Sequence, residues 1–275
     1  MRKALDRGFT FYLPLVCYAI FTLLPFYSML TLAFHVGGET TGTFSYLPIP
    51  FTLEHFRVLF DEDSFLPYVR NSILVSLGTV ILDIPLALLA GYALSRYRFR
   101  GKNAFMLSLL ATQFVPTAMM IIPIYIIFKD LGLLNNLIGL VLINTTFELP
   151  LAVLLMRTFI SSVPIELEEA SMVDGCTQAR GVIRVVIPML KPGLVAVGAF
   201  CFVGAWNGYL FALFLMSEQD RYTVPVGLSY FLGEFNIDYP ALAAGSLVAV
   251  VPVIAIFASA QRYITGGLAA GAVKG

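Results

Sequence analysis

The chain has 275 residues, of which 59% are hydrophobic and only 12% are charged, whereas roughly 25% of an ordinary soluble domain is charged. Together with a mean hydropathy of +0.86, this composition excludes a water-soluble globular protein. Lys and Arg number 17, as do Asp and Glu, so the formal net charge is zero and no basic excess favours binding to nucleic acid.

Six apolar runs follow one another along the chain, and each is long enough to cross a bilayer as a helix. About 20 residues at a rise of 1.5 Å span a hydrocarbon core of roughly 30 Å. Runs of this length lack the alternation of a membrane β-barrel. We therefore predict an all-α polytopic membrane protein with six transmembrane helices, forming one transmembrane domain over residues 1–275. The predicted spans cover residues 9–34, 72–95, 104–128, 137–156, 193–216 and 241–261.

The first run shares one feature with a signal peptide, because Arg2, Lys3 and Arg7 precede its apolar residues. However, it is longer than the roughly 7 to 15 apolar residues of a signal-peptide core, and no small-residue cleavage site follows it. We expect it to remain in the protein as a span.

The distribution of cations predicts the topology, because Lys and Arg are retained on the cytoplasmic side of short loops. With a cytosolic N-terminus, most of the 17 cations fall on the inside. We therefore predict a multi-pass protein of the cytoplasmic membrane with both termini in the cytosol. The cations left on the outside are Arg57, Arg70, Lys129 and Arg221.

Two long polar segments fall on the predicted outer side. Residues 35–71 read as a solvated connector with a short helix near residues 53–60. Residues 217–240 interleave aromatic and acidic side chains, which is costly for a bare linker and favours a docking surface.

A third polar segment, residues 157–192, is predicted to lie in the cytosol. Pro164 suits the first turn of a helix, acidic residues follow it, and Gly175 is a natural C-terminal stop. A second short helix is predicted over residues 177–186. Because the apolar positions of the first helix are spread around its circumference, we expect that helix to be enclosed, partly by its own membrane domain and partly by another protein.

This segment resembles the EAA loop of ABC importer permeases, whose pattern is E-A-A, three residues, G, nine residues, I, one residue, L-P. Trp206-Asn207 and the tail from Gln261 to Gly275 are similar to the permeases of carbohydrate importers, of the type of the smaller maltose-transporter membrane subunit. The matching residues of the loop are Glu169-Ala170-Ser171, Gly175, Val185 and Ile187-Pro188.

The resemblance implies a type I importer permease that moves a di- or oligosaccharide or related polyol by alternating access without catalysis of its own. It implies as partners a second homologous permease, two ABC ATPase subunits that bind ATP and Mg, and an external sugar-binding protein, with no cofactor on this chain. Glu169 is the expected polar contact with the ATPase, and Gly175 permits the turn. The implied ATPase-coupling residues are Glu168, Glu169, Ala170, Ser171, Asp174, Gly175 and Pro188.

Two absences agree with this division of labour. No Gly-x-x-x-x-Gly-Lys-Ser/Thr sequence occurs, so the chain does not cradle nucleotide phosphates in that way. The spans contain only two carboxylates, Asp83 and Glu148, fewer than many ion-coupled transporters need. Each precedes a proline by two residues and could serve backbone groups that the proline leaves free or a neighbouring helix, or the pathway. An ion-coupled secondary transporter remains the alternative, followed by a membrane-embedded enzyme.

The number and spacing of the cysteines and histidines give little support for a metal site or a disulfide. Cys17, Cys176 and Cys201 show no paired spacing, and the chain has two histidines. We expect neither a disulfide framework nor a metal site.

A pathway for a neutral sugar should combine amide groups with flat apolar rings. For Trp206 and Tyr209 an interfacial anchor is the alternative, and for Gln113 and Asn144 an interhelical hydrogen bond. The candidate pathway residues are Gln113, Asn144, Glu148, Trp206, Asn207 and Tyr209.

Overall fold

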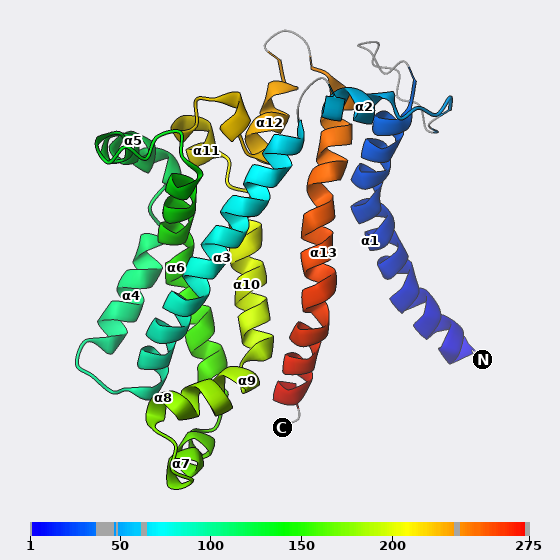
Figure 1. The fold of residues 1–275 in the computed structure, drawn as a ribbon. Helices are drawn as coiled ribbons and strands as arrows, with labels where there is room; N and C mark the ends of the chain where they lie inside the picture. Colours follow the sequence, from blue (N-terminus) through cyan, green and yellow to red (C-terminus); the bar gives the residue numbers. More distant parts are fainter. Residues whose placement is uncertain (1, 37–46, 48, 62–64, 234–236, 273–275) are drawn as a thin grey trace. The chain divides into compact units, whose positions relative to one another are not determined.

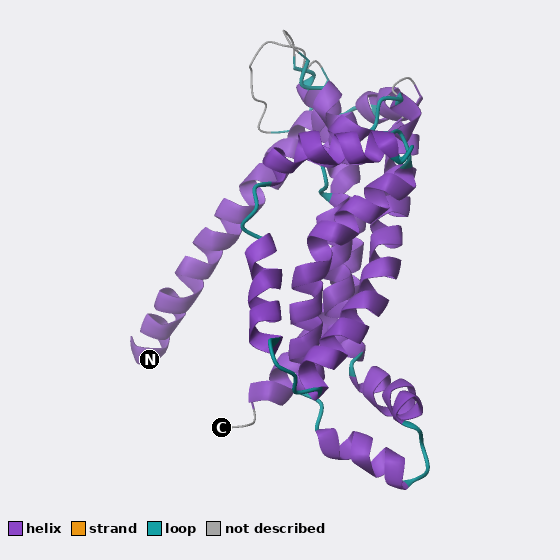
Figure 2. Ribbon diagram, turned by 90° about the vertical axis from the view of Figure 1, so that its left-hand side faces the viewer, coloured by secondary structure: helices purple, strands orange, loops and turns teal. Residues whose placement is uncertain are grey.

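The structure is a computed structural model that describes residues 2–36, 47, 49–61, 65–233 and 237–272. Within these ranges the chain is helical and contains no strand (Figure 2), which confirms the all-α prediction. The chain divides into two compact units, Met1–Leu66 with Gly227–Val251 and Pro67–Val226 with Pro252–Gly275. The prediction of a single domain therefore stays a prediction.

The first unit contains α1 (Arg2–Phe34), α2 (Glu54–Asp61) and the first part of α13 (Tyr239–Ala272) (Figure 1). Helix α2 confirms the short helix predicted near residues 53–60. Phe34 at the end of α1 stacks on Phe51 with ring centroids 5.1 Å apart. The side chains along α1 from Phe11 to Leu24 are exposed and mostly apolar, as expected of a helix that faces lipid.

The second unit contains most of the membrane helices. They are α3 (Phe65–Arg96), which begins two residues inside the first unit, α4 (Lys102–Thr112), α5 (Ile121–Asp130), α6 (Leu137–Ser161) and α10 (Lys191–Trp206). The short helices are α7 (Ile165–Val173), α8 (Gln178–Gly181), α9 (Ile187–Met189) and α11 (Leu210–Leu215), and α12 (Val224–Tyr230) joins the two units along the chain.

Four helices are long and apolar enough to cross a membrane, and they coincide with four of the predicted spans. These are Phe11–Phe34, Phe65–Arg96, Leu137–Ser161 and Tyr239–Gln261. The described residues give six spans if each of two bent helix pairs is counted as one span. These pairs are Lys102–Thr112 with Thr117–Asp130 and Gln178–Met189 with Lys191–Trp206.

The predicted spans 104–128 and 193–216 are not straight helices. Helix α4 ends at Thr112, and the following segment, Thr117–Asp130, is turned by 88°. Pro116 is extended, with ψ 122°, because a proline cannot donate the backbone hydrogen bond that would continue the helix and disfavours the α conformation just before it. The fifth run is interrupted after Trp206, and α11 begins only at Leu210.

Helices α6 and α10 run antiparallel and approach closely at glycines. A Cβ added at Gly193 would lie 2.5 Å from Phe159, and one added at Gly204 would lie 2.5 Å from Glu148 Oε1. Small residues at a helix interface let the two backbones come close in the absence of a hydrophobic driving force. At the end of this unit where α3 and α6 finish and α10 starts, the short helices α7, α8 and α9 gather (Figure 1).

Candidate functional site

Helix α7 begins and ends for local reasons that the sequence predicted. Pro164 precedes it in an extended conformation, and Glu166 and Glu168 occupy its first turn, where carboxylates favour the positive end of the helix dipole. Gly175 then adopts φ +87°, a conformation that L side chains rarely adopt. The N–H of Cys176 donates to the carbonyl of Ser171 at 3.0 Å, which makes a Schellman-type stop.

The buried side of α7 is polar and is attached to the end of α3. Glu168 and Ser171 are its two buried residues, each 7% exposed. Arg96 Nε donates to Glu168 Oε1 at 2.7 Å, and Tyr92 Oη donates to Glu168 Oε2 at 2.8 Å. Arg96 also donates to the carbonyl of Val163 at 2.8 Å. Both oxygens of the Glu168 carboxylate are thus occupied within the chain.

Helix α8 packs against α7 and extends the same network. Gln178 Nε2 donates to Tyr97 Oη at 2.8 Å and lies 3.4 Å from Tyr92 Oη. A Cβ added at Gly181 would lie 2.6 Å from Ser171 Oγ, so the two helices touch at a position that only glycine fits. The same side chains line a cavity of about 140 Å³ that also reaches Glu169 and Met172.

The rest of α7 is exposed and carries apolar side chains as well as the carboxylates of Glu166 and Glu169. Leu167 is 40% exposed, Met172 45% and Val173 87%. The burial of Glu168 and Ser171 fits the part of the prediction in which the membrane domain of this chain encloses the helix, and its enclosure by another protein stays a prediction. Exposed apolar patches of this kind mark interaction surfaces.

The remaining predicted coupling residues lie around this helix. Glu169, Ala170 and Asp174 are exposed. Pro188 is exposed within α9, and the turn before it, Val182–Val186, is wound as a π-helix. Since Pro188 has no N–H, the carbonyl of Arg184 loses its usual helical partner.

Sequence reasoning gave Glu169 the role of the polar contact and missed the inward role of Glu168. The partner of Glu168 is Arg96, which lies 72 residues away in the sequence, so no local pattern could pair them. The polar residues Glu168 and Ser171, three positions apart on one helical face, were the available signal for a polar buried side.

The predicted pathway residues are only partly brought together. Asn144 and Glu148 lie one turn apart on α6, where they face Gly208 and Gly204. Gln113 donates to the carbonyl of Phe147 at 3.2 Å, which is the interhelical bond that was its alternative. Trp206 is 3% exposed and stacks on Phe202, so in this chain it is buried and is not an exposed anchor. Asn207 and Tyr209 are exposed in the break before α11.

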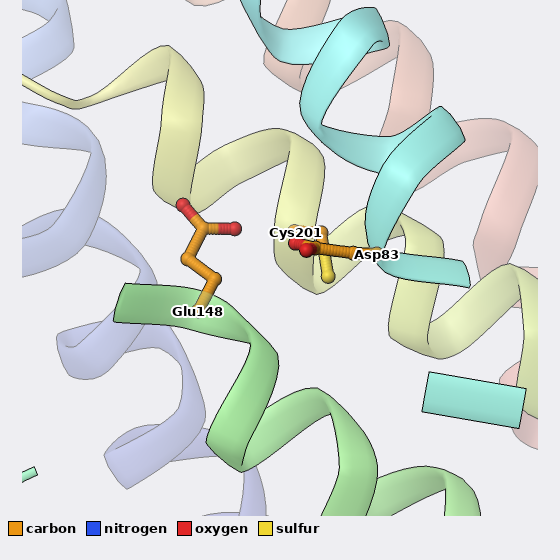
Figure 3. Close-up of side chains that lie close together, drawn as sticks. All are labelled: Asp83, Glu148 and Cys201. Carbon is orange, nitrogen blue, oxygen red and sulfur yellow. The ribbon is translucent and has the colours of Figure 1, made fainter. Parts of the chain in front are cut away.

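A second polar group lies inside the helix bundle. Asp83 of α3, Glu148 of α6 and Cys201 of α10 converge (Figure 3), with one ligand atom of each within 4.8 Å of the others. Asp83 is 0% exposed, and neither of its oxygens has a hydrogen-bond partner among the described residues. Of the two structural roles expected for Asp83, the position of its carboxyl beside Thr145 of α6 and Cys201 of α10 fits the contact with a neighbouring helix. Three residues from three helices gave no spacing signal in the sequence.

Long apolar helices, two bent helix pairs and a polar loop anchored at one end define a multi-pass helical membrane protein with a partly exposed loop helix, α7. Residues 83–266 match the family model described as binding-protein-dependent transport system inner membrane component. The chain belongs to this family, the permease components of such transport systems.

Curated relatives match over nearly the whole chain. The diacetylchitobiose uptake system permease protein DasC of Streptomyces coelicolor is 37% identical, with 92% of each chain covered. The trehalose transport system permease protein SugB of Mycobacterium tuberculosis is 34% identical, with 83% of this chain and 84% of that protein covered. The maltodextrin transport system permease protein MdxG of Bacillus subtilis is 31% identical, with 96% and 95% covered.

Solved structures agree on the fold. A chain of a bacterial ABC transporter involved in the import of the acidic polysaccharide alginate superposes with a TM-score of 0.77 at 24% identity, covering 96% of this chain and 98% of that chain. A chain of the MetNI methionine ABC transporter superposes with a TM-score of 0.57 at 14% identity, covering 78% of this chain and 98% of that chain.

Proposed function

We propose that this chain is one of two permease subunits of an ATP-driven importer, and that its solute is a carbohydrate. Relatives that are 31% to 37% identical are named as permeases for diacetylchitobiose, trehalose and maltodextrin. The proposed substrate is accordingly a di- or oligosaccharide or a related polyol. The chain itself is non-catalytic in this proposal, and an external sugar-binding protein delivers the solute.

The observation that carries the proposal is the two-sided character of α7. Its polar side is tied to α3 through Glu168 and Arg96, while Leu167, Met172 and Val173 are exposed. A helix held on one side, with apolar side chains and the carboxylates of Glu166 and Glu169 exposed on the rest of its surface, suits insertion into a cleft of a partner. We assign the role of this partner to an ABC ATPase. The assembly contains two such ATPase subunits, which bind ATP and Mg.

Force from the ATPase would reach the membrane helices through the same contacts. The Arg96–Glu168 pair is buried, with side-chain exposures of 10% and 9%, so it is shielded from solvent and holds α7 to α3 with little slack. Closure of the ATPase dimer moves α7, α3 follows, and the permease pair opens outward to the docked binding protein. ATP hydrolysis then resets the assembly.

The pathway in this proposal runs along α6 and the break after α10. Asn144 and Glu148 offer polar groups on one helical face. The exposed Asn207 and Tyr209, which follow Trp206 in the sequence, add an amide and an aromatic ring. Gln113, whose amide already bonds to α6, would position that helix.

The proposed orientation places α7, α8 and both chain termini in the cytosol. Its support is the cluster of cations at the end of the unit that carries these helices, since short loops rich in Lys and Arg stay inside. The cations of this end are Arg96, Arg98, Arg100, Lys102, Arg157, Arg180, Arg184 and Lys191.

Reconstitution separates this function from its alternative, an ion-coupled secondary transporter. Proteoliposomes would carry the full chain either alone or with its permease and ATPase partners, and uptake of labelled oligosaccharides would be measured with the binding protein outside. We expect uptake only with the partners and with ATP on the ATPase side. Uptake by the chain alone, driven by a proton or sodium gradient, would overturn the proposal.

A further inference from the structure

The cluster of Asp83, Glu148 and Cys201 presents a charge problem that the chain does not solve by itself. Asp83 is fully buried, and both of its oxygens lack a hydrogen-bond partner among the described residues. Glu148 Oε2 is buried and equally without a partner there. An ionised carboxylate taken out of water without a partner costs several kcal/mol, on the order of the desolvation penalty of a buried ion.

No cation of the described chain relieves this cost. The ion pairs formed within the described ranges involve Asp61, Glu168 and Asp220, and neither Asp83 nor Glu148 takes part in them. The next cation along α6 is Arg157, nine residues beyond Glu148, which is about 13 Å at 1.5 Å per residue. The cluster therefore needs a positive charge from outside the chain, supplied by protons or by a metal ion.

A neutral group also lines the cluster. Thr145 is 8% exposed, and its hydroxyl and the Cys201 thiol are the donors that lie beside the Asp83 carboxyl. Neither donor carries a positive charge, and Glu148 Oε2 has no partner among the described residues, so these contacts leave the charge of the two carboxylates uncompensated.

The space around Glu148 is kept open by a glycine. A Cβ added at Gly204 would lie 2.5 Å from Glu148 Oε1 and 2.7 Å from Glu148 Cδ. Any other residue at this position would push the carboxylate aside. Gly204 thus lets Glu148 reach the side of α10 that also carries Cys201 (Figure 3).

We propose that Asp83, Glu148 and Cys201 bind a divalent transition-metal ion of the zinc type, with the Thr145 hydroxyl next to it. Two carboxylates alone would suit calcium or magnesium, whereas a thiolate selects softer ions such as zinc or cobalt. Ligand atoms around tetrahedral zinc lie about 3.5 Å apart, given metal–ligand distances of about 2.0–2.3 Å. The ligand atoms of Asp83, Glu148 and Cys201 lie within 4.8 Å of one another, so metal binding requires these side chains to move closer together.

Binding offsets the charge of the cluster. The Cys201 thiol releases its proton to water as the metal–sulfur bond forms, so the two carboxylates and the thiolate contribute three negative charges against the two positive charges of the ion, and one carboxyl group that keeps its proton makes the site neutral. The metal would tie α3, α6 and α10 together inside the bundle. This departs from the expectation of no metal site, which rested on cysteine spacing along the sequence and could not register a site assembled from three helices.

Cobalt substitution tests the site directly. The purified full-length chain in detergent would be stripped with a chelator, loaded with Co²⁺, and examined for the near-ultraviolet thiolate-to-cobalt charge-transfer band. We expect one bound ion per chain and a band that Cys201→Ala abolishes. Cys176→Ala is the matched control, because Cys176 is a free cysteine outside the cluster, and it should keep the band.

The carboxylates are tested with variants that preserve their size. Asp83→Asn and Glu148→Gln should each weaken Zn²⁺ binding by at least tenfold in competition with a chromophoric chelator, and should reduce the rise in melting temperature that Zn²⁺ gives the unaltered chain. A chain that binds no stoichiometric metal, because protons alone neutralise the carboxylates, overturns the proposal. Equal binding by all three variants overturns it as well. Neither readout involves sugar, ATP or a partner, so this proposal and the transport function can fail separately.

Discussion

Arg96 Nε and Glu168 Oε1 lie 2.7 Å apart and join the last turn of α3 to α7. This buried pair turns Glu168, one of the predicted coupling residues, toward the membrane helices, while Glu169, the predicted polar contact with a partner, is exposed. The pair attaches α7 to a membrane helix.

The first prediction concerns this pair. Arg96→Gln leaves the Glu168 carboxylate buried with Tyr92 as its remaining side-chain partner, and removal of one member of a buried ion pair costs about 3–5 kcal/mol. We expect α7 to loosen and sugar-stimulated ATP hydrolysis by the reconstituted assembly to fall by about tenfold or more, while the assembly still inserts in the membrane. The exposed Glu166→Gln in the same helix should leave the stimulation unchanged. The coupling role assigned to Arg96 is wrong if both variants behave like the unaltered chain.

The second prediction concerns the apolar side of α7. Val173 is 87% exposed, so Val173→Asp should leave the fold of this chain intact. If the ATPase covers this residue, the new carboxylate is buried against apolar surface and the affinity for the ATPase should drop by about tenfold or more. Val173→Ala, which removes two methyl groups without adding charge, should cause a much smaller drop. Titration of the solubilised chain with labelled ATPase would measure both, and equal affinities for the two variants would place Val173 outside the interface.

The third prediction separates backbone strain from function with two matched glycines. Gly175 and Gly101 both have φ +87° and no heavy atom within 4 Å of an added Cβ, so alanine at either position costs about 1–2 kcal/mol for the left-handed conformation. We expect similar losses in thermal stability for Gly175→Ala and Gly101→Ala. Only Gly175→Ala, at the end of α7, should reduce coupled transport. An equal transport defect in both would show that the effect is a general loss of stability.

The sequence predicted the helices of this fold better than it predicted the contacts between them. Length and hydropathy identified Phe65–Arg96 and Leu137–Ser161 as spans, because a long apolar helix has few other stable environments. The run 104–128 was predicted as one span, and Pro116 in its middle was the visible signal of the bend after Thr112. In the loop, Gly175 predicted the stop of α7 because a positive φ is a local property.

The contacts at both sites depend on which helices become neighbours. Glu168 meets Arg96 only after α3 and α7 are brought to the same end of the unit. Asp83 meets Cys201 only through the packing of α3 against α10. Neither relationship leaves a periodicity or a spacing in the sequence, and no motif of either site could have revealed it.

The last prediction tests the close approach of α6 and α10. Gly204→Ala would place a methyl group 2.5 Å from Glu148 Oε1, whereas Gly198→Ala on the same helix would meet Ile84 at an ordinary 3.7 Å. Because overpacking costs about 1–3 kcal/mol and displaces the Glu148 carboxylate, Gly204→Ala should lower both the melting temperature and the transport rate. Gly198→Ala should leave both nearly unchanged. Shortening the opposing side chain offers a direct check, since the double variant Gly204→Ala with Glu148→Ala removes the clash and should recover the melting temperature. Transport should stay low in that double variant if the carboxylate itself is required, and stability that fails to recover would mean that the added methyl group clashes with something other than Glu148.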